Sequence, residues 1–93
     1  MAKYVTLYNY RSAIAGGGPE RFKEVQKIVA AEQGEIHAVY GLLGAYDIVA
    51  IGEFPTPEAA MKAAAKISNL IGASSQTMPA VELEDFLRIV SEV

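Results

Sequence analysis

The chain has 93 residues, of which 52% are hydrophobic and 20% are charged, with no cysteine and a formal net charge of -3. This length predicts a single domain over residues 1–93, and the lack of cysteine excludes disulfides, thiolate metal sites and thiol catalysis. The acidic balance argues against nucleic acid as a partner, because phosphate binding needs a basic face.

The distribution of apolar residues bears on location and assembly. No apolar run approaches the roughly 20 residues that a membrane span needs. Met1-Ala2-Lys3-Tyr4 passes directly into a strand pattern and leaves no room for a signal peptide. We therefore expect a soluble, cytoplasmic protein with no membrane partner. Its apolar content exceeds what so small a core can hide, which predicts that the protein forms a homodimer or higher oligomer.

A first strand is predicted over Tyr4–Tyr10, where aromatic and β-branched residues alternate with a period of two. Its two faces carry different side chains, with Tyr4, Thr6, Tyr8 and Tyr10 on one and Val5 and Leu7 on the other. A glycine-rich loop follows, and Pro19 suits the first turn of a helix. We expect this helix to end at Gly34 in the left-handed conformation. Its apolar stripe comprises Phe22, Val25, Ile28 and Val29.

The next two strands are predicted to form a hairpin. Glu35–Tyr40 supplies one strand, and Gly41–Gly44 returns the chain antiparallel into a second strand over Tyr46–Ile51. Apolar side chains in this second strand point to both faces, with Ile48 and Ala50 on one side and Val49 and Ile51 on the other. Such a strand suits the centre of a sheet.

The second half of the chain repeats the helix and strand pattern. Thr56-Pro57-Glu58 offers an N-cap, a first-turn proline and an acidic first-turn residue, so a helix is predicted from there to Gly72. A fourth strand follows over Ser74–Val81, where Pro79 indicates an edge position or a bulge. A terminal helix is predicted over Glu82–Val93. Its apolar stripe comprises Leu83, Phe86, Leu87 and Val90.

This element order predicts an α+β fold, a ferredoxin-like split βαββαβ sandwich with an added C-terminal helix. We expect the first and third strands in the middle of the sheet and both crossover helices on one face. The other face is also apolar at its middle, so we expect the same face of a second copy to cover it. The pair would form a dimeric α/β barrel with an interior lined partly by the tyrosines of the first strand.

Two stretches of the sequence carry a resemblance to a known family. Gly44-Ala45-Tyr46-Asp47-Ile48-Val49-Ala50-Ile51, followed by Pro55-Thr56-Pro57-Glu58-Ala59-Ala60, resembles the GYD domain family, which is named after a glycine, tyrosine and aspartate signature. Ala45 here separates the glycine from Tyr46-Asp47. The resemblance covers nearly the whole chain and implies a ferredoxin-like dimeric α/β barrel, without implying a specific function. A more distant likeness is to effector-binding domains of feast/famine transcription regulators, which share the glycine-then-aspartate entry to this strand.

The entry to the central strand is the first candidate site. Tyr46 and Asp47, next to Gly44, offer a phenol and a carboxylate that can hold a polar ligand through charge-assisted hydrogen bonds. The alternative is that Asp47 caps the hairpin turn and accepts hydrogen bonds from backbone N–H groups.

His37 is the second candidate, as the only histidine in the chain. An imidazole there can act as a base, a haem ligand or a proton shuttle. The alternative is an ordinary strand residue. No second ligand stands at a metal-binding spacing from His37, so we expect no metal site.

Tyrosines and glycines supply two further candidates. Tyr4, Tyr8, Tyr10 and Tyr40 can line a pocket for a planar ligand or pack at an interface. Stacking of RNA bases on them is excluded by the net charge and by Asp47 in the third strand. The run Gly16-Gly17-Gly18-Pro19 precedes a helix, where phosphates can bind, but it matches no phosphate-binding spacing and predicts a flexible loop.

Taken together, these patterns predict a non-enzymatic oligomeric module that binds a small polar or aromatic molecule at a cleft or subunit interface. We expect no catalytic residue and no cofactor. The predicted ligand-binding residues are Gly44, Tyr46, Asp47, His37 and Tyr8. One alternative is a cofactor-independent oxygenase or isomerase with His37 or Asp47 as base, by analogy with other dimeric α/β barrels. Another is a purely structural assembly protein.

Overall fold

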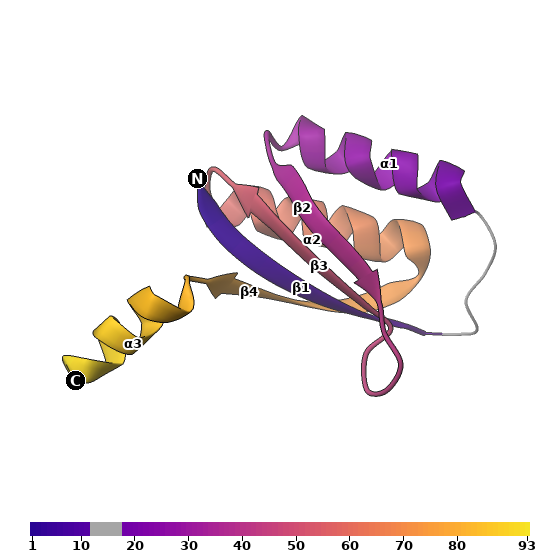
Figure 1. Ribbon diagram of the computed structural model, residues 1–93. Helices are drawn as coiled ribbons and strands as arrows, with labels where there is room; N and C mark the ends of the chain where they lie inside the picture. The colour runs from indigo at the N-terminus through magenta and orange to yellow at the C-terminus, as the bar shows by residue number, and fades with distance from the viewer. Residues whose placement is uncertain (12–17) are drawn as a thin grey trace.

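The computed structural model describes residues 1–11 and 18–93 and contains a four-stranded sheet with three helices (Figure 1). Its elements in chain order are β1 (Ala2–Tyr10), α1 (Gly18–Ala31), β2 (Glu35–Gly41), β3 (Ile48–Phe54), α2 (Pro57–Ile71), β4 (Ala73–Ala80) and α3 (Leu83–Ser91). Helices α1 and α2 lie side by side on one face of the sheet, and α3 projects beyond the end of β4 (Figure 1). Gly16 and Gly17 of the predicted glycine loop lie outside the described residues.

The sheet has the order β2-β3-β1-β4, and all of its pairings are antiparallel. This arrangement confirms the predicted ferredoxin-like α+β fold, with β1 and β3 in the middle. It also confirms the edge position of β4, which contains Pro79. Proline has no N–H to donate to a neighbouring strand, so an edge strand tolerates it where a central strand would lose a ladder hydrogen bond.

Both ends of α2 follow the sequence signals. The Thr56 hydroxyl accepts a hydrogen bond of 3.1 Å from the backbone N–H of Ala59, and Pro57 opens the helix. Gly72 ends it in the left-handed conformation at φ 66°, with its N–H donating to the Ser68 carbonyl. These contacts satisfy helix-end groups that would otherwise lack a partner.

The end of α1 differs from the prediction. The left-handed residue is Gln33, at φ 60°, and not Gly34. The N–H of Gly34 donates to the Val29 carbonyl and that of Gln33 to the Ala30 carbonyl, both at 2.9 Å, which is the Schellman pattern shifted by one residue. Gly34 is needed for space, because a Cβ there would lie 2.5 Å from Cε1 of Phe54.

The core lies between the sheet and the two crossover helices. Tyr4 and Tyr8 of β1 point into it, and Tyr4 makes an edge-to-face contact with Phe54 at a ring-centroid distance of 6.1 Å. The expectation that tyrosines of the first strand line an interior between two subunits is therefore wrong for these two residues. They face the helices of their own chain, because the strand alternation that groups them also turns them away from the helix-free face.

The two crossover helices pack differently. The alanine-rich α2 contacts β1, β3 and β4, and its Ala60 and Ala63 are buried against the sheet. By contrast, α1 contacts α2 and β2. Small side chains let α2 approach the sheet closely, whereas α1 stands off from the central strands. No large hydrophobic side chain of residues 1–11 and 18–93 is completely buried as a result.

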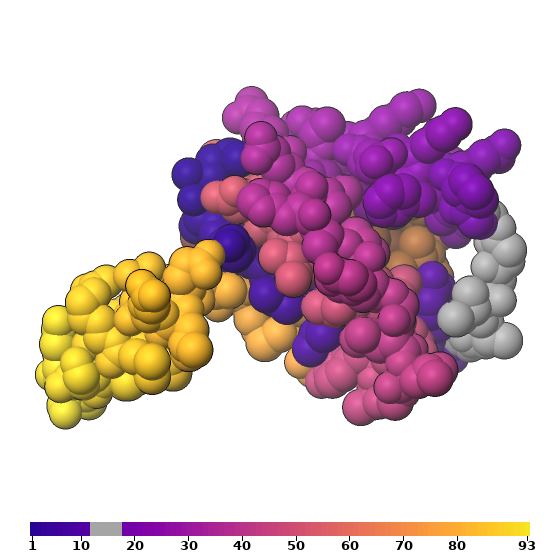
Figure 2. Space-filling view, viewed as in Figure 1, coloured from indigo at the N-terminus to yellow at the C-terminus, as the bar shows by residue number. Residues whose placement is uncertain are grey.

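The last helix stands apart from this sandwich. Within the described chain α3 packs against no other element, and it forms a separate lobe in the space-filling view (Figure 2). The radius of gyration is 14.1 Å, against about 12 Å for a compact domain of this length. Phe86 and Leu87 are 51% and 54% exposed, so the predicted apolar stripe is present but has nothing to cover it. None of the helices in the described part of the chain is long and apolar enough to cross a membrane.

The start of α3 is joined to the sheet by one ion pair. The Lys3 ammonium lies 2.8 Å from the Glu82 carboxylate, just before the helix begins. The hydrogen bond to Glu82 raises the pKa of Lys3 above its ordinary value.

Candidate ligand-binding cavity

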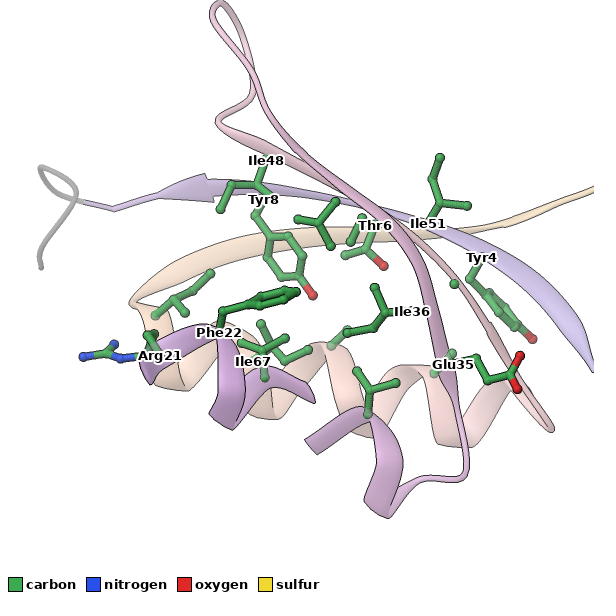
Figure 3. Close-up of a pocket in the computed structure, with 18 of the residues that line it drawn as sticks. Tyr4, Thr6, Tyr8, Arg21, Phe22, Glu35, Ile36, Ile48, Ile51 and Ile67 are labelled. Carbon is green, nitrogen blue, oxygen red and sulfur yellow. The ribbon is translucent and has the colours of Figure 1, made fainter. Parts of the chain in front are cut away.

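A cavity of about 560 Å³ lies between the sheet, α1 and α2 (Figure 3). It occupies the space that α1 leaves by standing off from the central strands. Residues from several elements that are far apart in the sequence line it, among them Tyr8, Phe22, Ile36, Ile48 and Ile67. Most of these side chains are apolar, so the cavity favours a ligand with a largely apolar body.

Tyr8 carries the main polar group that faces this space. Its side chain is only 4% exposed, and its hydroxyl points into the cavity above Phe22 (Figure 3). Burial raises the pKa of Tyr8 to about 12. The phenol therefore stays protonated at physiological pH and is able to donate a hydrogen bond to a ligand.

Two further polar side chains reach the cavity wall but have partners already. The Thr6 hydroxyl lies 3.0 Å from that of Thr77, which leaves it some capacity for another hydrogen bond. Arg21 donates from Nη1 to the Leu70 carbonyl at 2.6 Å, near the end of α2. Its guanidinium points away from the middle of the cavity (Figure 3). Glu35 also lines the cavity, at the end far from Tyr8 (Figure 3), with its carboxylate 3.8 Å from His37 Nε2. Around Tyr8 the arrangement therefore offers hydroxyl groups rather than a charge to a bound molecule.

The predicted site at the entry to β3 lies outside this cavity. Asp47 Oδ2 accepts a hydrogen bond of 2.8 Å from the Tyr10 N–H, while the Asp47 N–H donates to the Tyr8 carbonyl at 2.9 Å. These contacts are of the backbone-capping kind and tie β1 to the connection before β3. The Tyr46 hydroxyl lies 3.3 Å from Gln76 Oε1, and Gly44 adopts φ 126°. A ligand-binding role for Gly44, Tyr46 and Asp47 stays a prediction.

His37 lies in a different part of the sheet. It sits at a β-bulge in β2, with Nε2 2.7 Å from Glu53 Oε2. Because Asp47 immediately precedes β3 and Glu53 lies near its far end, His37 and Asp47 are at opposite ends of that strand. The two residues therefore do not converge on one cavity, which counts against the alternative of an oxygenase or isomerase with His37 or Asp47 as base.

The tyrosine cluster expected from the sequence is also divided. Tyr4, Tyr8 and Tyr10 line the cavity, whereas Tyr40 is exposed on β2. Sequence reasoning identified Tyr8 but missed the helix residues opposite it, Phe22 and Ile67. Phe22 belongs to the apolar stripe predicted for the first helix, but such a stripe indicates packing and does not show that a space remains beside it.

Solved structures share this fold. The chain matches a homoserine dehydrogenase from Thiobacillus denitrificans with a TM-score of 0.55 and 22% identity, over 84% of this chain and 16% of that one. It matches the leucine response regulatory protein of Mycobacterium tuberculosis with a TM-score of 0.67 and 10% identity, over 87% of this chain and 51% of that one. It matches FFRP-DM1 with a TM-score of 0.60 and 20% identity, over 87% of this chain and 100% of that one.

At these identities the likeness shows the fold alone, and this chain spans 16% and 51% of the first two proteins. No curated protein matches the sequence. The family model described as GYD domain matches residues 4–90.

Proposed function

The chain belongs to the GYD domain family, and we propose that it is a self-associating module that binds a small, largely apolar or aromatic molecule between its sheet and helices. The observation that carries this proposal is the cavity of about 560 Å³ with the Tyr8 hydroxyl pointing into it. Small-molecule sites in proteins typically measure about 300–1,000 Å³ and combine an apolar lining with few polar groups. The ligand we propose has a ring or compact hydrocarbon body and one hydrogen-bond acceptor for Tyr8.

Two uncovered apolar surfaces support self-association. The first is the helix-free face of the sheet, whose middle is formed by Val5, Leu7, Val49 and Ile51. In Figure 3 the Ile51 side chain points away from the cavity, toward this face. The second is the apolar stripe of α3. A second copy that covers both surfaces would remove them from water, and hydrophobic burial would drive the association.

A thermal-shift panel of aromatic and aliphatic small molecules tests the ligand proposal on the full chain. At least one class should raise the melting temperature, and calorimetry should give about one site per chain. Tyr8→Phe should weaken binding of that compound at least about fivefold, since a buried hydrogen bond contributes about 1 kcal/mol. Tyr46→Phe is the matched control, because it removes a hydroxyl outside the cavity.

Two results would overturn the ligand proposal. One is the absence of a shift for every compound class, which is what the alternative of a purely structural assembly protein predicts. The other is an equal effect of Tyr8→Phe and Tyr46→Phe on binding, which would move the ligand away from Tyr8.

Light scattering at micromolar concentration tests self-association. We expect a mass of at least two chains, and Ile51→Lys should shift it to that of one chain while the circular dichroism of the fold is kept. Met61→Lys, on the exposed side of α2, is the control and should leave the mass unchanged. A monomeric mass for the unmodified protein would reject this part of the proposal. The cytoplasmic location expected from the sequence stays a prediction.

A further inference from the structure

Three ionisable side chains from β2 and β3 converge at one end of the sheet. Glu35, His37 and Glu53 each bring one nitrogen or oxygen atom to within 4.8 Å of the others. His37 Nε2 is 2.7 Å from Glu53 Oε2 and 3.8 Å from Glu35 Oε2. Two carboxylates thus face one imidazole nitrogen.

The strand pairing explains how these residues meet. Glu35 and Glu53 are direct partners in the β2–β3 register, so their side chains start side by side. The register shifts between Ile36 and Ala38, and the bulge that results turns His37 toward Glu53. Gly52 permits this close approach, because a Cβ there would lie 2.6 Å from the Glu35 carbonyl oxygen.

The surrounding charges do not neutralise the two carboxylates. Lys3 is the register partner of Glu53 on β1, but its ammonium is engaged by Glu82 at 2.8 Å. Among the described residues no lysine or arginine forms an ion pair with Glu35 or Glu53. The negative charge of the two carboxylates therefore favours a bound cation. Access from solvent is open, since the Glu35 side chain is 67% exposed while that of Glu53 is 27% exposed.

We propose that Glu35, His37 and Glu53 form a binding site for a divalent transition-metal ion, of which Zn²⁺ is the representative. Imidazole nitrogen and carboxylate oxygen bind Zn²⁺ at about 2.0–2.2 Å, so three ligands around one ion lie about 3–4 Å apart. The observed separations need only small side-chain rotations to reach that arrangement. Three protein ligands leave at least one position of the ion for water or another small ligand.

This site goes beyond the proposed function: it shares Glu35 with the wall of the ligand-binding cavity, whereas His37 and Glu53 do not line that cavity. The sequence did not predict it, because Glu53 comes from a neighbouring strand and His37 reaches it only through the bulge. The competing explanation is a histidine–glutamate ion pair with no affinity for metal.

Titration of the full, tag-free chain with ZnCl₂ by calorimetry tests the proposal. We expect one Zn²⁺ per chain, and a loss of affinity of at least about tenfold in each of His37→Ala, Glu35→Gln and Glu53→Gln. Glu24→Gln is the matched control, because it removes an exposed carboxylate on α1 that is not part of the cluster, and it should change the affinity little.

The unmodified protein offers a second readout that does not depend on a variant folding. His37 is the only histidine, so its ring resonances in a ¹H–¹⁵N spectrum report on one site. Stoichiometric Zn²⁺ should shift its Nε2 resonance while the amides of α2 stay in place. Absence of saturable one-to-one binding, an unchanged His37 ring signal, or equal affinity in His37→Ala would each overturn the proposal and leave only an ion pair.

Discussion

Gly34 lies directly against the aromatic ring of Phe54, where a Cβ would come within 2.5 Å of Cε1 and 3.0 Å of the Glu53 carbonyl oxygen. The turn after α1 is thereby packed onto the end of β3. Because the glycine is required for space, Gly34→Ala should force Phe54 or the backbone to move. We expect it to lower the free energy of unfolding by about 1–3 kcal/mol, as overpacking of a tight site does. Urea denaturation measures this change.

Gly41→Ala is the control for that substitution. A Cβ at Gly41 meets nothing within 4 Å, so the stability should change little. Equal effects at the two positions would show that the contact with Phe54 is not what makes Gly34 necessary.

Substitution of the neighbouring residue, Gln33, by glycine should change the free energy of unfolding in the opposite direction. Gln33 is held at φ 60°, a conformation that costs a residue with a side chain about 1 kcal/mol and costs glycine little. Gln33→Gly should therefore raise the free energy of unfolding by up to about 1 kcal/mol, less the additional chain entropy of glycine in the unfolded state. Thermal denaturation of Gln33→Gly and of Gly34→Ala compares the need for a left-handed backbone at position 33 with the need for space at position 34. A fall in stability would mean that the Gln33 side chain makes a contribution larger than its backbone strain.

Alkaline pH should destabilise the protein through Tyr8. Burial raises its pKa from 10.0 to about 12, so the native state holds the phenol proton more tightly than the unfolded state does. The contribution is complete below pH 10 and is lost as the pH rises toward 12, to a total of about 2–3 kcal/mol. Stability measured across this range should fall less steeply in Tyr8→Phe than in the unmodified protein. Tyr40→Phe, at an exposed position, should keep the full slope.

Asp47 is expected to matter for stability. Its carboxylate accepts the Tyr10 N–H at 2.8 Å in a half-buried position, and hydrogen bonds to charged groups contribute about 1.5–3 kcal/mol. Asp47→Ala should lower the free energy of unfolding by about that amount and speed hydrogen exchange at the Tyr10 amide. Asp47→Asn keeps an acceptor and should cost less. If Asp47→Ala left both quantities unchanged, the role of Asp47 as a ligand-binding residue would gain weight over the capping role.

Local sequence signals were sufficient for the fold because each acts within a few residues. The alternation in β1, the run in β3 that is apolar on both faces, the cap at Thr56 and the proline in β4 all predict features that short stretches of chain determine. The prediction that Gly34 is the left-handed residue after α1 was wrong, because a glycine after a helix can serve either to adopt a left-handed backbone or to leave space for a neighbouring side chain. Here the backbone torsion falls on Gln33, while Gly34 provides the room for Phe54.

The candidate sites depend on relations between distant segments, which the sequence does not display. The cavity exists because alanines bring α2 close to the sheet while α1 stands off, so its size reflects two helices together. The meeting of His37 with Glu53 depends on the β2–β3 register and its bulge. Residue type alone named Tyr8 and Tyr40 equally as candidates for a pocket, although only Tyr8 lines the cavity and Tyr40 is exposed on β2.

Both borders of the sheet carry features that discourage the addition of another strand. Pro79 interrupts the row of N–H donors along β4, and the bulge bends the free side of β2. Open-ended growth of the sheet into fibres is therefore disfavoured on either flank, even though so much apolar surface is uncovered. Concentrated solutions of this protein should yield closed assemblies of few chains instead of amyloid.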